Sequence, residues 1–496
     1  MSPDRTTTQR VEFRGLEYHA DDRIHPATYS MEGSSGGGWR IDRNGVEHLV
    51  LGAGYRLLRT DRCGVCSTDL DRRFLPFPLP QIIGHELIAL DADGKRYVVE
   101  INASHAARGL EDGCAFCSAG LTTHCPDRRV LGIHDLPGGF GPWVLAPERA
   151  MIPVPHGLSD DVAVLVEPFA AALHAAEQVA PEPGARVAVL GPRRLGLLVV
   201  AALAARRKRD GSHYPILALS RRQALRDLAL NFGADEALEP PSDPGRSGPL
   251  AEIVIDTTGS PLGLEASLGL ARQEVHLKST HGQPAGGLAH TTELVVDEIS
   301  LQAWPDSETE IASLLHRAPC RAGDTPRIAW LARQAPPETL AQNAEVLTGH
   351  DAISLLARLE STPGPLPRAD IAVVDSAAGV DAALRPRAEE EIALVRPRGR
   401  ICIYGGKPGD GPVLSAIRER GLTLSGSRCG DFRRALDLLA SDSELATRLS
   451  SLVTHRLPAQ RLPQALKLAR SPECIKVVLH HPPREQTTDA RHRDEA

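Results

Sequence analysis

The stretch Cys63–Glu86 reads CGVCSTDLDRRFLPFPLPQIIGHE, and the interpretation of the whole 496-residue chain depends on it. It contains thiols, carboxylates and an imidazole that directly follows a glycine. Thiolate and imidazole are ligand types that Zn²⁺ prefers, and a catalytic zinc typically has three protein ligands and one open position. A cysteine and a histidine at this separation are weak evidence alone, because cysteine is often just a small buried hydrophobe.

The motifs around that pair strengthen the zinc interpretation. GVCSTD followed by GHE resembles the catalytic-zinc segment of zinc-dependent alcohol dehydrogenases, which belong to the medium-chain dehydrogenase/reductase superfamily. The resemblance implies that Cys66 and His85 bind the catalytic zinc. It also implies that Glu86 acts beside the metal-bound histidine rather than as a resting ligand. Thr68 is placed by resemblance to accept the alcohol proton. Asp69 either supports the site or is a simple helix-start carboxylate.

The third ligand of the catalytic zinc is expected from VEPFAAALHA, which resembles the segment of family members that use glutamate there. This assigns Glu167. The plainer alternative is a helix-start carboxylate stabilised by the helix dipole. An apolar run precedes Glu167 and Pro168 follows it, so a buried charge there needs compensation. Zn²⁺ would provide that compensation.

A second metal site is predicted in GLEDGCAFCSAGLTTHC. Cys114, Cys117 and Cys125 have the spacing of three of the four cysteines in the structural-zinc lobe of these dehydrogenases. By resemblance the fourth thiolate would fall at Glu111, and a carboxylate can also bind zinc. His124 is another candidate for that place. The alternative is a lobe that has lost its metal and keeps three packed cysteines.

Composition indicates a soluble intracellular enzyme. The net charge is −7 and both signs are interspersed, so no cluster of basic residues indicates nucleic-acid binding. The longest apolar run, 195–205, is shorter than the roughly 18–20 residues of a membrane span. The N-terminus lacks the apolar segment of a signal peptide. Nine cysteines in such a chain favour metal ligands over disulfides, and we expect the cytoplasm.

Residues 181–302 alternate strands and helices, as parallel α/β sheets do. RVAVLG predicts the first strand, and GPRRLGLLVVAALAARR predicts a glycine turn that opens a helix. Gly191 and Gly196 match the first and third glycines of the dinucleotide fingerprint, whereas Arg193 stands at the second. An arginine there either crowds the phosphates or contacts them.

The predicted cofactor is NADP(H) in preference to NAD(H). NAD-binding versions carry an acidic residue at the end of the next strand, and this chain has Ser220, Arg221 and Arg222 instead. Guanidinium groups favour a 2′-phosphate, although a solvated basic turn would look the same in sequence. The resemblance also implies that Thr258 lies near the cofactor and that Arg428 contacts its pyrophosphate.

The family pattern is interrupted by residues 303–420, which repeat the preceding half. RIAWLARQAPPETL echoes PILALSRRQALRDL, and ADIAVVDSAAG echoes AEIVIDTTGS. We predict a degenerate Rossmann-like repeat without a glycine phosphate loop. It would occupy the sheet edge through which relatives dimerise, which favours a monomer; a free edge would give a homodimer.

The expected fold is α/β, a GroES-like β-rich catalytic domain plus a Rossmann domain with a half-repeat insertion. In chain order we expect a catalytic domain at 1–180, a Rossmann domain at 181–302, the repeat at 303–420, the last Rossmann strand and the return to the catalytic domain at 421–482, and a disordered tail at 483–496.

The predicted function is a zinc-dependent alcohol or polyol dehydrogenase acting on a small molecule, without nucleic-acid or membrane partners. Zinc polarises the substrate oxygen, and hydride passes between the substrate carbon and nicotinamide. The alternative is a repurposed, non-catalytic relative that senses NADPH or acts as a scaffold; Arg193, Glu111 and the insertion favour it. Three intact candidate zinc ligands oppose it, and they also oppose a zinc-free reductase.

Overall fold

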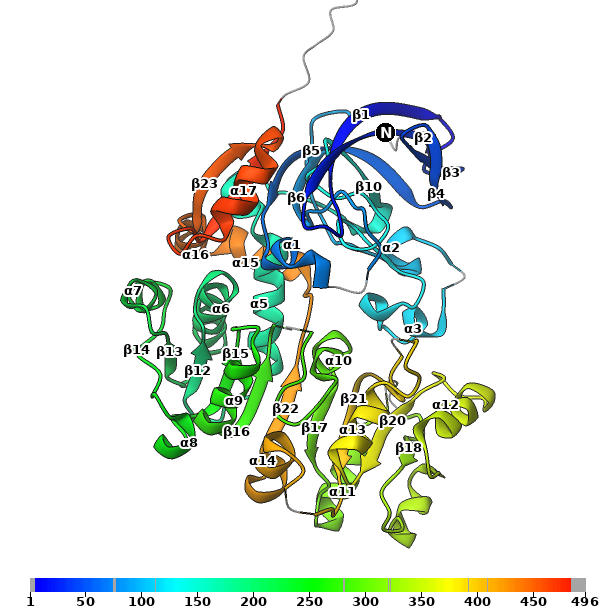
Figure 1. The fold of residues 1–496 in the computed structure, drawn as a ribbon, viewed down its shortest axis with the longest axis vertical. Helices are drawn as coiled ribbons and strands as arrows, with labels where there is room; N and C mark the ends of the chain where they lie inside the picture. Colours follow the sequence, from blue (N-terminus) through cyan, green and yellow to red (C-terminus); the bar gives the residue numbers. More distant parts are fainter. Residues whose placement is uncertain are drawn as a thin grey trace, which may run out of the picture. The chain divides into compact units, whose positions relative to one another are not determined.

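The computed structural model describes residues 5–74, 77–111, 113–279, 282–319, 321, 323–390, 392–407 and 409–482. The expectation of a disordered tail at 483–496 lies outside these residues. The chain divides into two compact units, each described by itself. Unit 1 comprises 1–101, 129–154 and 453–496, and unit 2 comprises 102–128 and 155–452. Figure 1 shows the elements of each unit.

Unit 1 is mostly antiparallel β structure. A four-stranded sheet has the order β1-β2-β3-β4, and a seven-stranded sheet has the order β11-β7-β6-β5-β24-β23, with β10 also paired to β5. The strands are β1 Gln9–Tyr18, β2 Ile24–Ser34, β3 Gly38–Arg43, β4 Val46–Leu51, β5 Tyr55–Gly64, β6 Glu86–Leu90, β7 Arg96–Val99, β9 Arg129–Val130, β10 Trp143–Pro147, β11 Met151–Pro153, β23 Val453–Pro458 and β24 Lys476–His480. Short helices follow at α1 Ser67–Leu70, η1 Arg72–Phe74, η3 Glu148–Ala150, η5 Ala459–Arg461 and α17 Leu462–Ala469.

The centre of unit 2 is one eleven-stranded sheet with the order β14-β13-β12-β15-β16-β22-β17-β21-β20-β18-β19. Its strands are β12 Val187–Leu190, β13 Ile216–Leu219, β14 Glu236–Leu238, β15 Ala251–Asp256, β16 Ala271–Leu277, β17 Ser300–Ala303, β18 Arg327–Trp330, β19 Glu345–Thr348, β20 Ala369–Val374, β21 Val395–Ile403 and β22 Thr423–Gly426. All neighbours pair in parallel except β17 and β22, which pair antiparallel at Leu301 and Leu424.

The repeat seen in the sequence corresponds to a repeat in the sheet. On either side of the β17–β22 junction the outward orders are β22-β16-β15-β12-β13-β14 and β17-β21-β20-β18-β19. By the sequence repeat β18 corresponds to β13 and β20 to β15, and because β18 pairs directly with β20, the second half has no counterpart of β12 between them. It therefore also lacks the glycine turn that follows β12. The strands of 303–420 extend the large sheet instead of forming a separate lobe.

The helices of unit 2 mostly connect successive strands of its sheet, as parallel neighbours require. They are α4 Asp160–Ala163, α5 Val166–Gln178, α6 Arg194–Asp210, α7 Gln223–Asn231, α8 Pro244–Ser247, α9 Pro261–Leu270, α10 Thr291–Val296, α11 Glu308–His316, η4 Glu338–Gln342, α12 Ala352–Ser361, α13 Ala377–Leu384, α14 Pro412–Arg420, α15 Phe432–Ser441 and α16 Ser443–Ser450. The small lobe at 102–128 adds β8 Asn102–Ala103, α2 His105–Arg108, α3 Ala115–Ser118 and η2 Thr122–His124.

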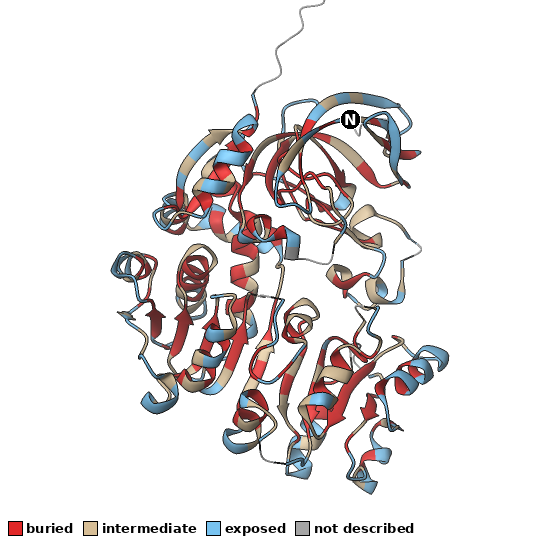
Figure 2. Ribbon diagram, viewed as in Figure 1, coloured by how far each residue is buried: buried red, intermediate tan, exposed pale blue. Residues whose placement is uncertain are grey.

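The strands of the large sheet are buried and its connecting helices are exposed on one side, as the colours in Figure 2 show. This confirms the predicted α/β class, with a β-rich part and a doubly wound part. The residue limits of the predicted domains stay a prediction. No described helix combines the length and the hydropathy needed to cross a bilayer.

We expect the protein to be a monomer, because β17 already occupies the side of β22 that a second chain would need. Light scattering over a range of protein concentrations measures this. One mass near 53.2 kDa is expected. A stable species of twice that mass would contradict the prediction.

Candidate active site and metal centres

Strand pairing in unit 1 brings the two halves of the GVCSTD…GHE motif together. β5 and β6 pair antiparallel with Gly64 opposite Glu86. Cys66 lies two residues after Gly64 and His85 lies one residue before Glu86, so both lie at the same end of the strand pair. Gly64 is required by space, since a Cβ there would lie 2.3 Å from the Glu86 carboxylate. Gly84 has φ +100° and packs against the Phe140 ring, which explains the glycine before His85.

Cys66, His85 and Glu86 form a potential metal-binding group, with ligand atoms all within 4.8 Å of one another. Cys66 is the N-cap of α1, and its backbone N–H donates to Asp69 Oδ2 at 2.8 Å. The other Asp69 oxygen lies 3.4 Å from His85 Nδ1, and the aspartate side chain is only 1% exposed. Asp69 thus lies beside the imidazole, and its supporting role stays a prediction.

Electrostatics in this group favour a cation. Burial disfavours the imidazolium form of His85, but Asp69 and the Cys66 thiol outweigh it and raise the pKa of His85 well above its ordinary value. The donor set of thiol and imidazole suits zinc. Thr68 is half-buried in α1, two residues beyond Cys66.

Glu86 is fully buried and is neutralised by a residue that sequence reasoning missed. Lys476, in β24, donates to both Glu86 carboxylate oxygens at 2.5 and 2.7 Å and to the Val65 carbonyl at 3.2 Å. This pairing supports a role for Glu86 beside the site rather than as a ligand. A lone lysine in the apolar run CIKVVL was the signal, since a buried lysine needs a counter-ion.

The cysteine lobe of unit 2 contains a second potential metal-binding group. Its members are Cys114, Cys117, Cys125 and, unexpectedly, His105, with ligand atoms all within 4.8 Å of one another. His105 Nδ1 lies 3.3 Å from Cys125 Sγ, and the Cys114 and Cys125 sulfurs are 3.7 Å apart. Burial raises the pKa of the Cys125 thiol to about 12. Three thiols and one imidazole are a typical structural-zinc set, so the residues present fit that metal.

The predicted fourth ligands of this lobe lie elsewhere. Glu111 is exposed and is not part of the group. His124 is buried, with Nε2 3.8 Å from Glu298, and is also outside it. His105 reaches the cysteines because α2 ends at Gly109 in the left-handed conformation, which turns the chain back. The spacing of the cysteines in the sequence gives no indication of this chain reversal. The resemblance therefore placed the fourth ligand at Glu111.

Glu167 lies in the first turn of α5, in unit 2. Its assignment as the third catalytic ligand stays a prediction. His174, on the same helix, pairs with Glu298 at 2.6 Å and is not in either metal-binding group.

The predicted dinucleotide turn follows β12. Gly191 has φ +83°, and a Cβ there would meet Thr258 at 2.9 Å. A Cβ on Gly196 would lie 2.7 Å from the Gly191 carbonyl oxygen, so the start of α6 packs closely on the turn. Close packing of the helix on the turn is the reason that the dinucleotide fingerprint has glycine at these two positions. Arg193 is the N-cap of α6, where its side chain is half-buried.

The other predicted cofactor residues lie at the carboxyl ends of neighbouring strands. Ser220 is buried after β13, and the exposed Arg221 and Arg222 follow it. The Thr258 hydroxyl donates to Asp256 at 2.7 Å. Arg428 donates through its guanidinium to the Thr123 carbonyl at 2.6 Å, so this side chain is tied to the cysteine lobe.

Comparison with known proteins agrees with this arrangement. Residues 52–156 match the alcohol dehydrogenase GroES-like domain. The L-galactonate-5-dehydrogenase of Escherichia coli K12 is 27% identical over 237 residues, which cover 45% of this chain and 67% of that protein. The chain is thus similar to alcohol dehydrogenases, including an uncharacterized zinc-type alcohol dehydrogenase-like protein of Haemophilus influenzae that is 26% identical over 280 residues, 52% of this chain and 72% of that protein.

Two solved structures share the fold of this chain. A putative zinc-binding dehydrogenase from Sinorhizobium meliloti, bound to NADP, aligns with TM-score 0.51 and 18% identity over 95% of this chain and 99% of its own. An E. coli CFT073 alcohol dehydrogenase complexed with NADH aligns with TM-score 0.55 and 16% identity over 95% and 99%. At these identities the likeness concerns the fold alone.

The lobe geometry generates a prediction about His105. Replacing His105 with Ala removes one of four ligands, and we expect the variant to lose one equivalent of zinc and to unfold at lower temperature. Elemental analysis and thermal denaturation measure both. Glu111→Ala is the matched control and should keep its zinc. The opposite pattern, zinc lost only with Glu111→Ala, would restore Glu111 as the ligand.

Proposed function

We propose that this protein is a zinc-dependent alcohol or polyol dehydrogenase that uses NADP(H). The observation that carries the proposal is the Cys66–His85 pair, with Asp69 behind the imidazole and the Glu86 charge neutralised by Lys476. Burying these charged side chains costs free energy, and side chains that only packed the core would not need to be charged. The L-galactonate relative supports a hydroxylated substrate.

Each residue of the site has a definite task in the proposed reaction. Cys66 and His85 would hold zinc, and Glu167 is proposed as the third ligand. When bound, zinc would polarise the substrate oxygen and lower the pKa of the alcohol. Asp69 is proposed to hold the orientation of the His85 ring, and the Thr68 hydroxyl is proposed to accept the alcohol proton. Hydride transfer is the chemistry of the nicotinamide cofactor.

NADP(H) is proposed because of the strand end at Ser220. No acidic side chain stands there to bind ribose hydroxyls, and Arg221 and Arg222 are both exposed at the start of α7. Cations at a helix N-terminus are unfavourable with respect to the helix dipole, so a bound phosphate would relieve a real cost. The glycine turn after β12 supports a dinucleotide but does not distinguish the two cofactors.

Loss of either predicted zinc ligand should abolish turnover. We expect Cys66→Ala and His85→Ala to lose catalytic zinc and NADP⁺-dependent alcohol oxidation, both measured on purified protein. Cys402→Ala, which removes a buried thiol from β21, is the control and should stay active. Full activity in both ligand variants would overturn the zinc mechanism. A wild-type protein with neither zinc nor NADPH binding would favour the scaffold alternative.

Cofactor preference should depend on the two arginines. A phosphate paired with arginine contributes about 1.5–3 kcal/mol, or roughly ten- to a hundredfold in affinity. The double variant Arg221→Ala, Arg222→Ala should lose that preference in fluorescence titrations with NADPH and NADH. Arg246→Ala, an exposed arginine of α8, is the control for the loss of a surface arginine elsewhere in the unit. Tighter binding of NADH by the wild type would show that the preference is reversed.

A further inference from the structure

The first strand of unit 1, β1, has one edge without a partner strand. It stands first in the order β1-β2-β3-β4 and pairs with β2 on one side over its whole length. On its other side, within the described residues, only Tyr18 has a backbone partner, since two hydrogen bonds of 2.9 and 3.1 Å join it to Gln81. The remainder of that edge is unpaired, and an unpaired edge is a template for another strand.

The Tyr18–Gln81 pair fixes which residues of β1 face the open edge. In an antiparallel ladder, the backbone N–H and C=O groups of alternate residues point to opposite edges of the strand. The residues in phase with Tyr18 therefore also face outward, and they are Arg10, Glu12, Arg14 and Leu16. Thr28 of β2 agrees with this, because it stands opposite Arg14 but exchanges its hydrogen bonds with Asn44 instead, at 2.9 and 2.8 Å.

Alternate side chains of β1 also point to opposite faces of the sheet. Gly15 and Glu17 point into the unit, since a Cβ on Gly15 would lie 2.6 Å from Ile82 and Glu17 is fully buried. The side chains of the edge residues Arg10, Glu12 and Arg14 are exposed. Their side chains and their free backbone groups are therefore both accessible to a segment that approaches β1 from outside.

A cavity of about 510 Å³ lies along this edge, and we call it the β1 groove. One wall contains the four edge residues of β1. The facing wall includes Phe140, Pro142 and Trp143, together with Arg59, which stands opposite Trp143 in the pairing of β5 with β10. All of these residues belong to unit 1. The open edge of β1 thus faces a second wall rather than bulk solvent alone.

The β1 groove carries positive charge that the chain does not neutralise. Glu12 is the only carboxylate among the described residues that line it, and it pairs with Arg10 at 2.6 Å. In the described part of the chain no carboxylate lies within ion-pair distance of Arg14 or Arg59, and Arg59 donates only to the Pro482 carbonyl at 3.3 Å.

Charges on an edge strand can serve only to discourage pairing with other chains. That explanation covers the arginines of β1. It does not cover Arg59, because this side chain stands on the facing wall, on the central strand β5 of the other sheet. Two arginines on opposite walls, with a tryptophan between them and an open strand edge, are instead suited to an extended anionic ligand.

We propose that the β1 groove binds an extended acidic peptide segment of a partner protein, which adds to the four-stranded sheet beside β1. Main-chain hydrogen bonds to the open edge hold the segment, and its alternate side chains provide selectivity. Directly opposite residues of an antiparallel pair share a face, so carboxylates of the segment lie beside Arg10 and Arg14. An apolar side chain of the segment lies beside Leu16. This interaction does not depend on the proposed dehydrogenase function.

Trp143 provides a local signal for binding. It is half-buried, whereas the other three tryptophans, Trp39, Trp304 and Trp330, are at most 5% exposed. The probe is the blocked peptide Leu-Thr-Glu-Thr-Thr-Val-Glu, whose glutamates fall opposite the two arginines of β1 when it pairs antiparallel. We expect a saturable change in tryptophan fluorescence of the full chain that is absent in Trp143→Phe. The same peptide with lysine in place of both glutamates should bind at least tenfold more weakly.

Arginine variants test the charge of the groove. Arg14→Ala and Arg59→Ala should each weaken peptide binding by roughly two- to fivefold, as expected for exposed ion pairs. Arg40→Ala, an exposed arginine of β3 in the same sheet, is the matched control and should bind like the wild type. Equal binding of the glutamate and lysine peptides would overturn the proposed charge recognition.

Glu12→Pro tests strand addition itself. It removes one N–H from the open edge without removing a hydrogen bond to β2, and proline is tolerated at such positions. We expect this variant to lose peptide binding at an unchanged melting temperature, whereas Glu12→Ala keeps the N–H and should still bind. Peptides N-methylated at either alternate set of amides provide a test on the unmodified protein. One set should abolish binding and the other should preserve it.

Three results would overturn the proposal. The first is no binding of the glutamate peptide by the full chain, and the second is equal binding of the two N-methylated peptides. The third is a mass that doubles with concentration in the wild type but not in Glu12→Pro, which would assign the edge to a second copy of this chain. If the full chain does not bind but a chain ending at Pro482 does, the groove belongs to the segment 483–496 instead of a partner.

Discussion

The antiparallel contact between β17 and β22 is the constraint on which unit 2 depends. Leu301 and Leu424 meet there without any solvent exposure, and every other strand pair of the sheet is parallel. A parallel half-sheet ends in an edge with unpaired backbone groups. In this chain β17, the edge strand of one half, pairs with β22, the edge strand of the other half. The core then continues across the junction, so neither half has its hydrophobic face complete alone.

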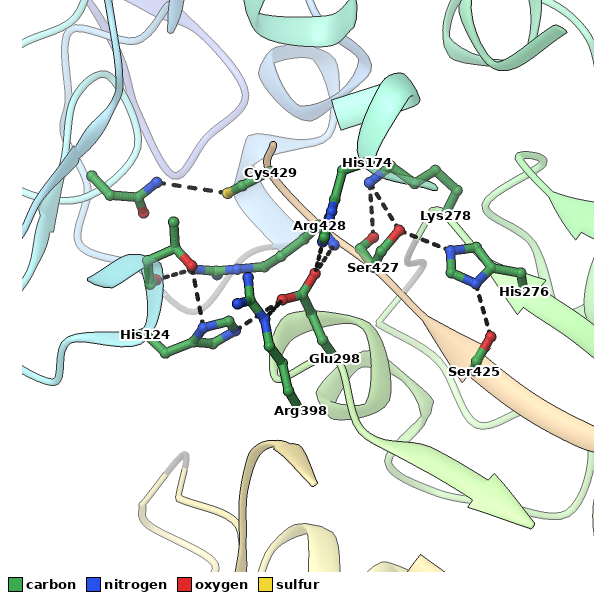
Figure 3. Close-up of polar contacts among 12 residues, drawn as sticks. His124, His174, His276, Lys278, Glu298, Arg398, Ser425, Ser427, Arg428 and Cys429 are labelled. Atoms are coloured by element: carbon green, nitrogen blue, oxygen red, sulfur yellow. Dashed lines mark hydrogen bonds and ion pairs between the residues drawn. The ribbon is translucent and has the colours of Figure 1, made fainter. Parts of the chain in front are cut away.

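Buried charge organises both units in a similar way. In unit 1 the Glu86–Lys476 pair is almost fully buried, and it ties the last strand of the chain to the zinc motif. In unit 2 Glu298 is 4% exposed and accepts from His174 at 2.6 Å and from Arg398 of the insertion at 2.7 Å. Figure 3 shows these side chains converging on the carboxylate. A lone buried carboxylate would be strongly destabilising, so each partner is needed to keep its unit folded. The backbone N–H of Arg428, just after β22, donates to the same carboxylate at 3.2 Å, so the insertion and the segment after β22 share one hydrogen-bond network.

Sequence reasoning went furthest where the chemistry is local. Cys66 and His85, which stand in short motifs, lie close together in the structure, and Gly191 and Gly196 occupy places where a Cβ has no room; their roles in binding zinc and cofactor stay predictions. The repeat at 303–420 was visible because strands of a half-sheet keep their order and patterning. Long-range partners could not be predicted in this way. Lys476 reaches Glu86 only through the pairing of β24 with β5, and His105 reaches the cysteines only because the chain reverses at Gly109.

The missing strand of the second half explains why only one cofactor site is expected. In the first half β12 stands between β13 and β15, and its carboxyl end leads into the glycine turn and the N-terminus of α6. A phosphate site needs both the free backbone N–H groups of a helix start and a turn that lets the ligand approach them. In the second half β18 and β20 are direct neighbours, so no strand delivers such a turn between them. What the repeat keeps is the ability to pair, pack and cover an edge. Without that strand, the second half contributes pairing and packing to the sheet. The glycine turn expected to bind the cofactor follows β12 of the first half.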